Sequence, residues 1–187
     1  MSDGFGLILP PTPGLPWITG NYYDYGVTRA ASGPAGSALS ANTIYTSLID
    51  VPPPGEDIDR IAIEVTATGT ATLARVGIFR IREDGKPSSL LIDGGAVDVS
   101  GTGRKEATVA IFLPPGPIAA AVLCNGTVTL MAYGTPSTSP YGYADTLTTT
   151  KQACAIYGSF AYAALPATFV TSSIIASAGP RVGLRAA

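Results

Sequence analysis

The stretch IDRIAIEVTATGTATLARVGIFRIREDGKPSSLLID, residues 58–93, decides the fold class. Its first part alternates apolar and polar side chains, which is the period of a strand with one face on a core. After small residues at 68–70, the run 72–82 is apolar on both faces, as in a strand covered on both sides. An Asp-Gly turn at 84–85 precedes a third apolar run at 90–92. The stretch predicts an antiparallel meander of three strands.

The same signals continue on both sides of this stretch. Pro- or Gly-rich corners separate further runs that read as strands, at 43–51, 96–99, 105–113 and 118–123. The pair Asn125-Gly126 predicts a two-residue hairpin that joins 118–123 to 127–133. No window keeps the apolar period of a helix. The sequence therefore predicts an all-β chain, with an antiparallel, jelly-roll-like β-sandwich over residues 41–187.

The charge content excludes several classes of partner. Charged residues make up 13% of the chain, against about 25% in ordinary soluble domains. The net charge of −2 offers no basic surface to nucleic acid or to anionic lipid. No segment has the roughly 18 uninterrupted apolar residues of a membrane helix, and the start of the chain lacks the basic region of a signal peptide. We expect synthesis in a cytoplasm and neither nucleic-acid nor membrane partners.

The residues that most often bind metals are scarce. The chain has no histidine and two cysteines, Cys124 and Cys154, which lie on apolar stretches. Such cysteines are more often buried and free than joined in a disulfide in a reducing compartment. Without histidine there is no Ser-His-Asp or Cys-His catalysis, and two thiols do not make a zinc site. We expect no metal and no cofactor.

Residues 1–40 have a composition of their own. They contain twelve glycines and prolines, yet also five aromatic side chains: Phe5, Trp17, Tyr22, Tyr23 and Tyr25. Disordered linkers are usually poor in aromatics, so this arm is expected to become ordered by lying on another surface. Aromatic anchors dominate interfaces, which favours docking onto a partner subunit, with residues 30–40 as a flexible hinge. The alternative is an arm that packs back on its own domain.

The second half of the chain is poor in charge. Between residues 107 and 180 the only charged side chains are Asp145 and Lys151. A monomeric surface of that length carries more charge, so this half either forms most of the core or faces sister subunits. The expectation is an oligomer interface.

A Ser/Thr/Pro/Tyr-rich loop at 134–151 is long for a compact domain, which suggests a functional or docked segment. Within it, Tyr141 and Tyr143 precede Asp145. Two tyrosines and an acid can stack on a sugar and hydrogen-bond its hydroxyls. The alternative is that the same tyrosines anchor the loop to a neighbouring subunit.

Two sets of acidic side chains are candidates for catalysis or for calcium binding. Asp57 and Asp59, with Glu64 further along, form the kind of carboxylate set that hydrolyses glycosides, but they stand at a strand start, where solvated acids are ordinary. Asp93 and Asp98 flank two glycines in a spacing that matches no EF-hand loop, so a turn role is expected. No pattern in the sequence indicates an enzyme.

Several stretches in order resemble a known class of proteins. They are ANTIYTSLIDVPPPGEDIDRIAIEVT at 41–66, ARVGIFRIREDGKPSSLLIDGGAV at 74–97, KEATVAIFLPPGPIAAAVLCNG at 105–126 and ALPATF at 164–169. Together they resemble β-sandwich virion proteins of tailed bacteriophages and gene transfer agents, of the tail-fibre, head-fibre or decoration type.

The resemblance implies a virion component that is a symmetric oligomer, often a trimer. Such a subunit is fixed to other virion proteins by its N-terminus, and its sandwich meets host-surface glycan. Two alternatives remain open. One is a capsid decoration or collar subunit with no ligand, and the other, the less favoured, is a polysaccharide-degrading spike.

Overall fold

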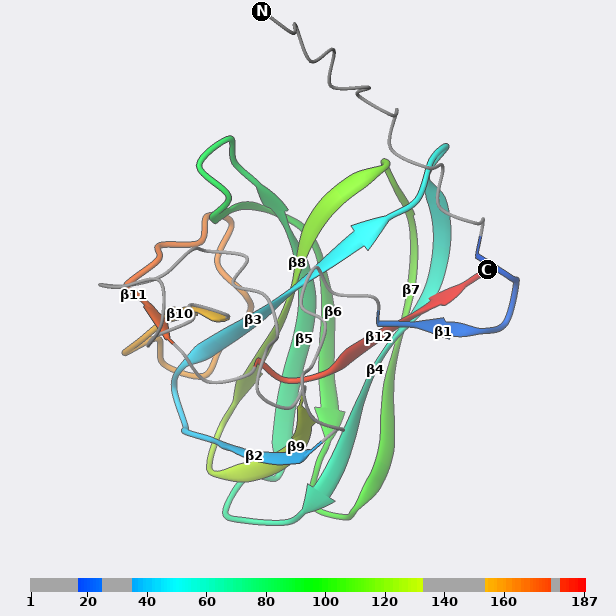
Figure 1. Cartoon of the computed structure of the whole chain (residues 1–187). Coiled ribbons are helices and arrows are strands. Elements are labelled where there is room, and N and C mark those ends of the chain that lie inside the picture. Colours follow the sequence, from blue (N-terminus) through cyan, green and yellow to red (C-terminus); the bar gives the residue numbers. More distant parts are fainter. Residues whose placement is uncertain (1–16, 25–34, 133–153, 176–178) are drawn as a thin grey trace, which may run out of the picture.

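The computed structural model describes residues 17–24, 35–132, 154–175 and 179–187, and these form an all-β fold, as the sequence predicted (Figure 1). Their strands are β1 (Tyr22–Tyr23), β2 (Ala35–Leu39), β3 (Ile44–Val51), β4 (Glu56–Ala67), β5 (Leu73–Ile81), β6 (Pro87–Asp98), β7 (Gly103–Leu113), β8 (Gly116–Cys124), β9 (Val128–Ala132), β10 (Cys154–Tyr157), β11 (Ser173–Ile175) and β12 (Val182–Ala186).

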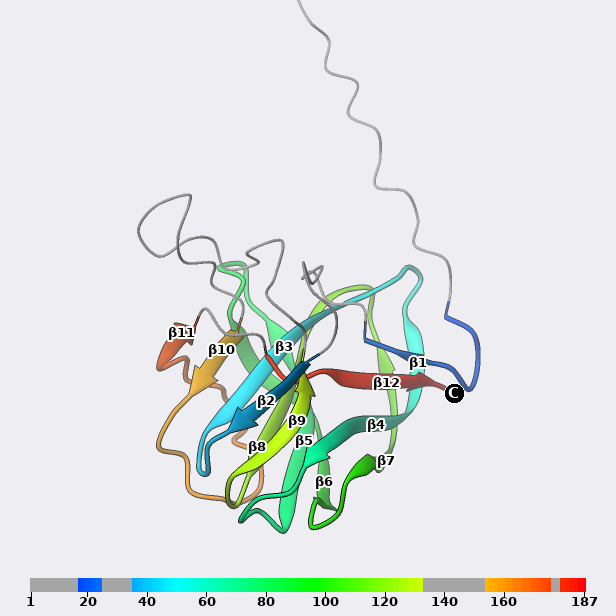
Figure 2. The ribbon, with the colours of Figure 1, turned by 60° about the horizontal axis from the view of Figure 1, so that its bottom comes forward.

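The strands make two antiparallel sheets (Figure 2). In the first, here the β4 sheet, β7 pairs with one edge of β4, while β12 and β9 share the other edge. Beyond them, β1 pairs with β12 and β2 pairs with β9. The second, the β8 sheet, has the order β11-β10-β3-β8-β5-β6. This is the antiparallel β-sandwich expected from the sequence.

The main core lies between the two sheets. From β4, the alternate residues Ile61, Ile63 and Val65 are at most 2% exposed, as the period-two pattern predicted. They meet residues of β8 such as Ile118 and Val122, which are also buried.

A second apolar cluster lies on the other face of the β8 sheet. Residues 158–170 cross this face and bring Leu165 and Phe169 onto Phe79 and Leu123. Consequently β8 is buried on both faces, which confirms the prediction that 118–123 is a fully covered strand. This burial accounts for the absence of charge from β8 itself.

The predicted three-strand meander is wrong. Strands β4 and β5 do not pair, because the small residues between them carry the chain from one sheet to the other. Strand β5 does form the expected antiparallel pair with β6. The two runs at 90–92 and 96–99, predicted as separate strands, lie largely in the single strand β6. A register shift within β6 leaves Gly94 without a partner in β5, and so makes a bulge.

The predicted Asn125-Gly126 hairpin is also wrong, since β8 and β9 belong to different sheets. The Asn125 side chain accepts hydrogen bonds from the backbone N–H groups of Thr72 and Leu73. Gly126 packs on the backbone at Thr70, where a β-carbon would come within 2.6 Å. The pair therefore lets two sheet-to-sheet crossings run side by side, instead of closing a ladder.

Asp93 fastens the covering segment to the β8 sheet. Its carboxylate accepts bonds from Arg75 Nε at 2.8 and 2.9 Å, from the N–H of Gly95 at 2.9 Å and from the N–H of Leu165 at 3.0 Å. Asp98 accepts from the N–H of Ser100, and the side-chain and backbone hydrogen bonds of Ser100 lower the pKa of Asp98. The expected turn role is confirmed for Asp98, whereas Asp93 lies within β6 and binds the covering segment.

We expect Asp93→Ala to lower the free energy of unfolding by about 2 kcal/mol, because three donors lose a charged acceptor in a half-buried setting. The measurement is urea denaturation followed by circular dichroism. Asp98→Ala is the control, since it removes bonds to a single residue, Ser100, at an exposed turn and should cost clearly less. Equal losses for the two variants would contradict the role given to Asp93.

The structure differs from the expected hinge at 30–40. Residues 35–39 form β2, which pairs over its full length with β9. The sandwich therefore includes part of the segment that composition alone assigned to the arm. Gly36 fits because a β-carbon there would lie 2.9 Å from the Thr129 side chain.

Candidate functional site

The predicted site residues divide between described and undescribed parts of the chain. Tyr141, Tyr143 and Asp145 lie outside the described residues, as do Phe5 and Tyr25. The other three aromatics of the arm, Trp17, Tyr22 and Tyr23, lie on the β4 sheet of their own chain. This matches the alternative considered for the arm, at least from residue 17 to residue 24.

Trp17 and Tyr23 form a stacked pair at the end of the β4 sheet. Their ring centroids are 4.6 Å apart and their planes differ by 5°. The backbone N–H of Trp17 donates to Glu56 Oε1 at 2.8 Å, and the Tyr23 hydroxyl accepts from the N–H of Ile18 at 2.7 Å. Trp17 also packs against the main core. The bond to Glu56 and the packing of Trp17 on the core hold the arm to the sheet, while the stacked rings and the Ile18–Tyr23 bond order the arm itself.

Tyr22 lies across the outer face of the same sheet. Pairing of β1 with β12 places its ring against Gly183, where a β-carbon would stand 3.4 Å from the ring. Its hydroxyl donates to Glu106 Oε1 at 2.6 Å. The guanidinium carbons of Arg104 and Arg185 are 4.8 and 5.9 Å from the ring centroid, within cation–π range. Burial, and then the bond to Glu106, raise the pKa of Tyr22.

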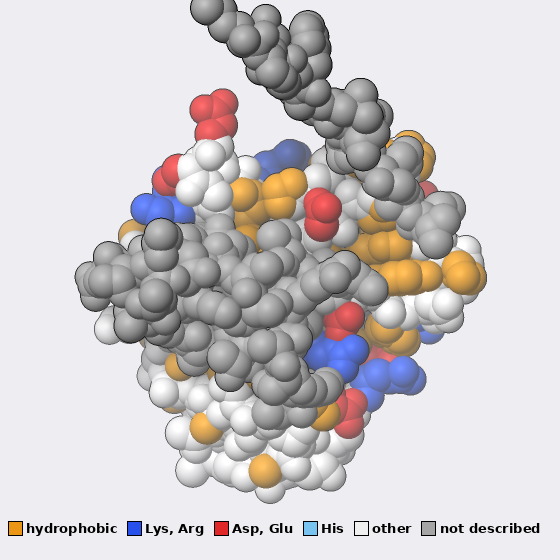
Figure 3. Space-filling view, viewed as in Figure 1, with side chains coloured by type: hydrophobic (Ala, Val, Ile, Leu, Met, Phe, Trp, Pro, Cys, Tyr) orange, Lys and Arg blue, Asp and Glu red, His pale blue; other side chains and the backbone are white. Residues whose placement is uncertain are grey.

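A cleft of about 360 Å³ opens beside Tyr22. Its lining residues are Tyr22, Asp24, Ala62, Ile63, Glu64, Arg104, Met131, Arg181 and Gly183. Small side chains at Ala62 and Gly183 keep its floor low. Basic and acidic side chains gather over β4 and β12 on the face shown in Figure 3. This cleft is the candidate site.

The charges around the cleft are arranged in pairs. Arg181 pairs with Asp24, and Arg104 Nε pairs with Glu106 Oε1 at 2.6 Å. Glu64 lies on β4, between Arg104 of β7 on one side and Arg181, which precedes β12, on the other. It has no ion pair among the described residues. Nearby, hydrogen bonds from Arg185 hold the pKa of Asp59 below its usual value, so this acid is engaged rather than poised for catalysis.

The arrangement suits reversible binding of a polar ligand. Guanidinium groups donate and a carboxylate accepts, while Met131 adds apolar surface. Among the described residues, no three of the side chains that commonly bind metals cluster closely enough to hold an ion. In the described ranges there is also no helix long and apolar enough to cross a membrane.

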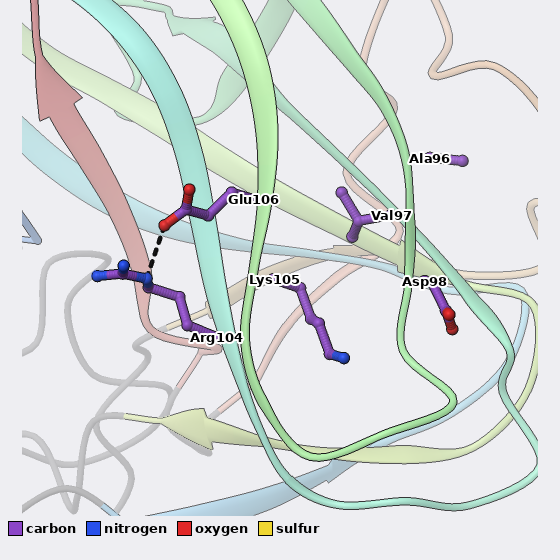
Figure 4. Close-up of a pocket in the computed structure, with 6 residues that line it drawn as sticks. All are labelled: Ala96, Val97, Asp98, Arg104, Lys105 and Glu106. Carbon is purple, nitrogen blue, oxygen red and sulfur yellow. Dashed lines mark ion pairs between the residues drawn. The ribbon is translucent and has the colours of Figure 1, made fainter.

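A second, more open hollow of about 700 Å³ lies between β6 and β7. Figure 4 shows it lined by Ala96, Val97 and Asp98 from β6 and by Arg104, Lys105 and Glu106 from β7. Arg104 and Glu106 lie together on one side of β7, whereas Lys105 points toward β6. Its walls are two strand edges rather than a closed cup.

Sequence reasoning did not find this cleft. The partners Asp24 and Arg181 are 157 residues apart, and Tyr22 is 84 residues from Glu106. No local motif joins such residues. The one available signal was the aromatic content of the arm, which did single out Tyr22.

Comparisons with known proteins bear on the fold alone. No family model matches the chain, and no curated protein matches it. Among solved structures, the fold is similar to part of Cwp84, a surface layer associated protein of Clostridium difficile, in a crystal structure of its cysteine protease and lectin-like domains. The TM-score is 0.49 and the identity 14%, over 80% of this chain and 34% of that chain. The chain thus spans about a third of that structure, and a likeness of this size carries no functional argument.

Proposed function

We propose that this chain is a non-enzymatic structural subunit of a tailed-phage-like particle that contacts host-surface glycan through the cleft beside Tyr22. The observation that carries the glycan-binding part is the composition of the cleft: two arginines, two acids and an apolar floor in about 360 Å³. The virion part rests on the resemblance of the sequence stretches given above.

The cleft chemistry matches what a sugar offers. A sugar hydroxyl both donates and accepts, so Glu64 can accept from one hydroxyl while an arginine donates to another. The side of a sugar ring that carries C–H groups can lie on Met131. Glu64 is the strongest acceptor available, because Asp24 is already paired with Arg181.

The attachment role of the arm is proposed for its first sixteen residues. From Trp17 onward, stacking, backbone pairing and the Tyr22 hydroxyl bind the arm to its own sandwich. Contact with another virion protein would then fall to the segment that contains Phe5. The subunit would be located in the virion after synthesis in the host cytoplasm.

We expect Glu64→Ala to weaken binding to the host polysaccharide at least about tenfold, because a hydrogen bond to a charged group contributes about 1.5–3 kcal/mol. Stability should change little, since Glu64 has no ion pair among the described residues. The measurement is calorimetric titration with capsular polysaccharide and with lipopolysaccharide of the host.

Glu83→Ala is the matched control, because it removes the same charge from an exposed turn away from the cleft. Its affinity should equal that of the unchanged protein. The glycan proposal fails if no host polysaccharide binds, or if both variants lose the same affinity.

A second candidate function is a capsid decoration or collar subunit with no ligand. It is favoured by the ion pairs Asp24–Arg181 and Arg104–Glu106, which satisfy most of the cleft charges within the chain. In that case the cleft is only the contact region that binds the arm to the β4 sheet. Particles that lack the subunit would then lose stability, while particles that carry it would bind no host glycan.

A further inference from the structure

Strand β7 ends the β4 sheet with an unpaired edge. One edge of its eleven residues pairs with β4, and no described residue pairs with the other. An edge of this length presents a row of unsatisfied N–H and C=O groups, which natural proteins usually cover or protect.

The neighbouring edge of the sandwich shows such cover. The segment 167–169 lies along β6, where the N–H of Leu90 donates to Ala167 O at 2.9 Å and the N–H of Phe169 donates to Ser88 O at 2.6 Å. Ser89 and Thr168 form an antiparallel bridge there. In the described part of the chain, nothing comparable lies along β7.

The second half of β7 has one of the usual protections, a bulge where Val109 and Ala110 both lie opposite Asp59 of β4, but it lacks the others. Residues 107–113 contain no charge, proline or glycine. The outward side chains there are Thr108, Ala110 and Phe112, and Phe112 is 55% exposed. Charges occur only in the first half, at Arg104, Lys105 and Glu106. This pattern is typical of a strand that another strand covers.

We propose that β7 pairs with β7 of a second copy, antiparallel and about a two-fold axis at Thr108, so that the two β4 sheets become one. This register sets Gly103 opposite Leu113 of the second copy, and the bulge at Val109 and Ala110 of each strand interrupts the ladder locally. The inference goes beyond the proposed function and does not depend on it.

The register is complementary along its length. Thr108 faces its own equivalent, and Thr–Thr is a favourable cross-strand pair. Arg104 lies opposite Phe112 of the second copy, so its aliphatic stem can pack on that exposed ring while its guanidinium stays with Tyr22 and Glu106. Glu106 faces Ala110, and Lys105 faces Ile111, so no two like charges meet. The incoming strand also crosses the open hollow beside Arg104 and Lys105 (Figure 4).

A second copy of the chain fits this edge better than an unrelated strand, because the pairing is self-complementary about a two-fold rotation axis. An isologous contact closes on itself and leaves neither β7 edge open to a third chain. The isolated protein is therefore expected to be a dimer in solution, in contrast to the trimer that the sequence resemblance implies.

The test is light scattering on the full chain over a series of concentrations, with Thr108→Lys and Ala110→Lys compared. The unchanged protein should have twice the chain mass of 19.0 kDa. Thr108→Lys sets two ammonium groups opposite each other and should raise the dimer dissociation constant about tenfold or more. Ala110→Lys sets each new lysine opposite Glu106 of the other copy and should leave the dimer intact.

Both positions are exposed, so each lysine fits the folded monomer, and circular dichroism checks this. Thr108→Glu repeats the test with the opposite charge and the same expected loss. A monomer or a trimer of the unchanged protein overturns the proposal, as does an equal effect of lysine at 108 and at 110. Glycan titration of the same samples separates this result from that of the Glu64 experiment.

Discussion

Substitution of Phe169 by alanine is expected to lower the free energy of unfolding by about 3–5 kcal/mol. The side chain is 3% exposed and meets Phe79 at 5.3 Å and Tyr157 at 5.8 Å, both in edge-to-face contacts. Alanine would leave a cavity between the covering segment and the β8 sheet and remove both aromatic pairs. Urea denaturation measures the loss, and hydrogen exchange should show the amides of residues 160–169 opening first.

The next residue supplies the control. Val170 is 56% exposed, so Val170→Ala shortens a side chain at the adjoining position without opening a cavity. Its effect should stay within about 0.5 kcal/mol. If Phe169→Ala also costs less than about 1 kcal/mol, the second apolar cluster contributes little and the covering segment is held by its backbone bonds alone.

The thiol of Cys124 is expected to react at least about a thousandfold more slowly with iodoacetamide in the native protein than in urea, at pH 8. Burial raises its pKa from 9.0 to about 12, and each unit lowers the thiolate population tenfold. The side chain is 1% exposed and unbonded to another cysteine, which confirms the expectation of a buried free thiol at this position. The measurement uses Cys154→Ser, so that one thiol remains.

The raised pKa of Cys124 also makes the protein less stable at alkaline pH. The unfolded chain loses the Cys124 proton near pH 9, whereas the folded chain keeps it until about pH 12. The unfolded state thus binds fewer protons in this window, so the free energy of unfolding falls as pH rises from 9 toward 12. Cys124→Ala should flatten that dependence. Native labelling as fast as labelling in urea would show that the thiol is accessible.

The strands were predictable because their signals are local. Alternation at 61–65, the two-sided apolar run at 118–123 and the proline corners each depend on neighbours in sequence, and all three match the structure. Which strands pair was less predictable. The turns at 68–70 and 125–126 have the composition of hairpins, yet each crosses between sheets, because the two crossings support each other through Asn125, Thr72 and Thr127.

The candidate site was less accessible to sequence reasoning than the fold. The sequence offered one set of acids as a glycosidase candidate and another as a calcium-site candidate. In the structure, Asp59 of the first set and Asp93 of the second are engaged in ion pairs. The cleft depends on Gly183 and Ala62 being small, so that Tyr22 can lie flat across β12 and β4. A small residue that leaves room for a ring from a distant segment has no recognisable pattern in the sequence around it. The tyrosines at 141 and 143 stay a prediction.

Strand β12 lies between β1 and β4, so the last residues of the chain form an interior strand of the β4 sheet (Figure 1). Val182 pairs with Ile63, and Leu184 pairs with Ile61 and with Tyr23. During synthesis, β4 therefore waits with an open edge until residues 182–186 have left the ribosome. Contacts of such long sequence separation close slowly, in milliseconds to seconds for all-β domains.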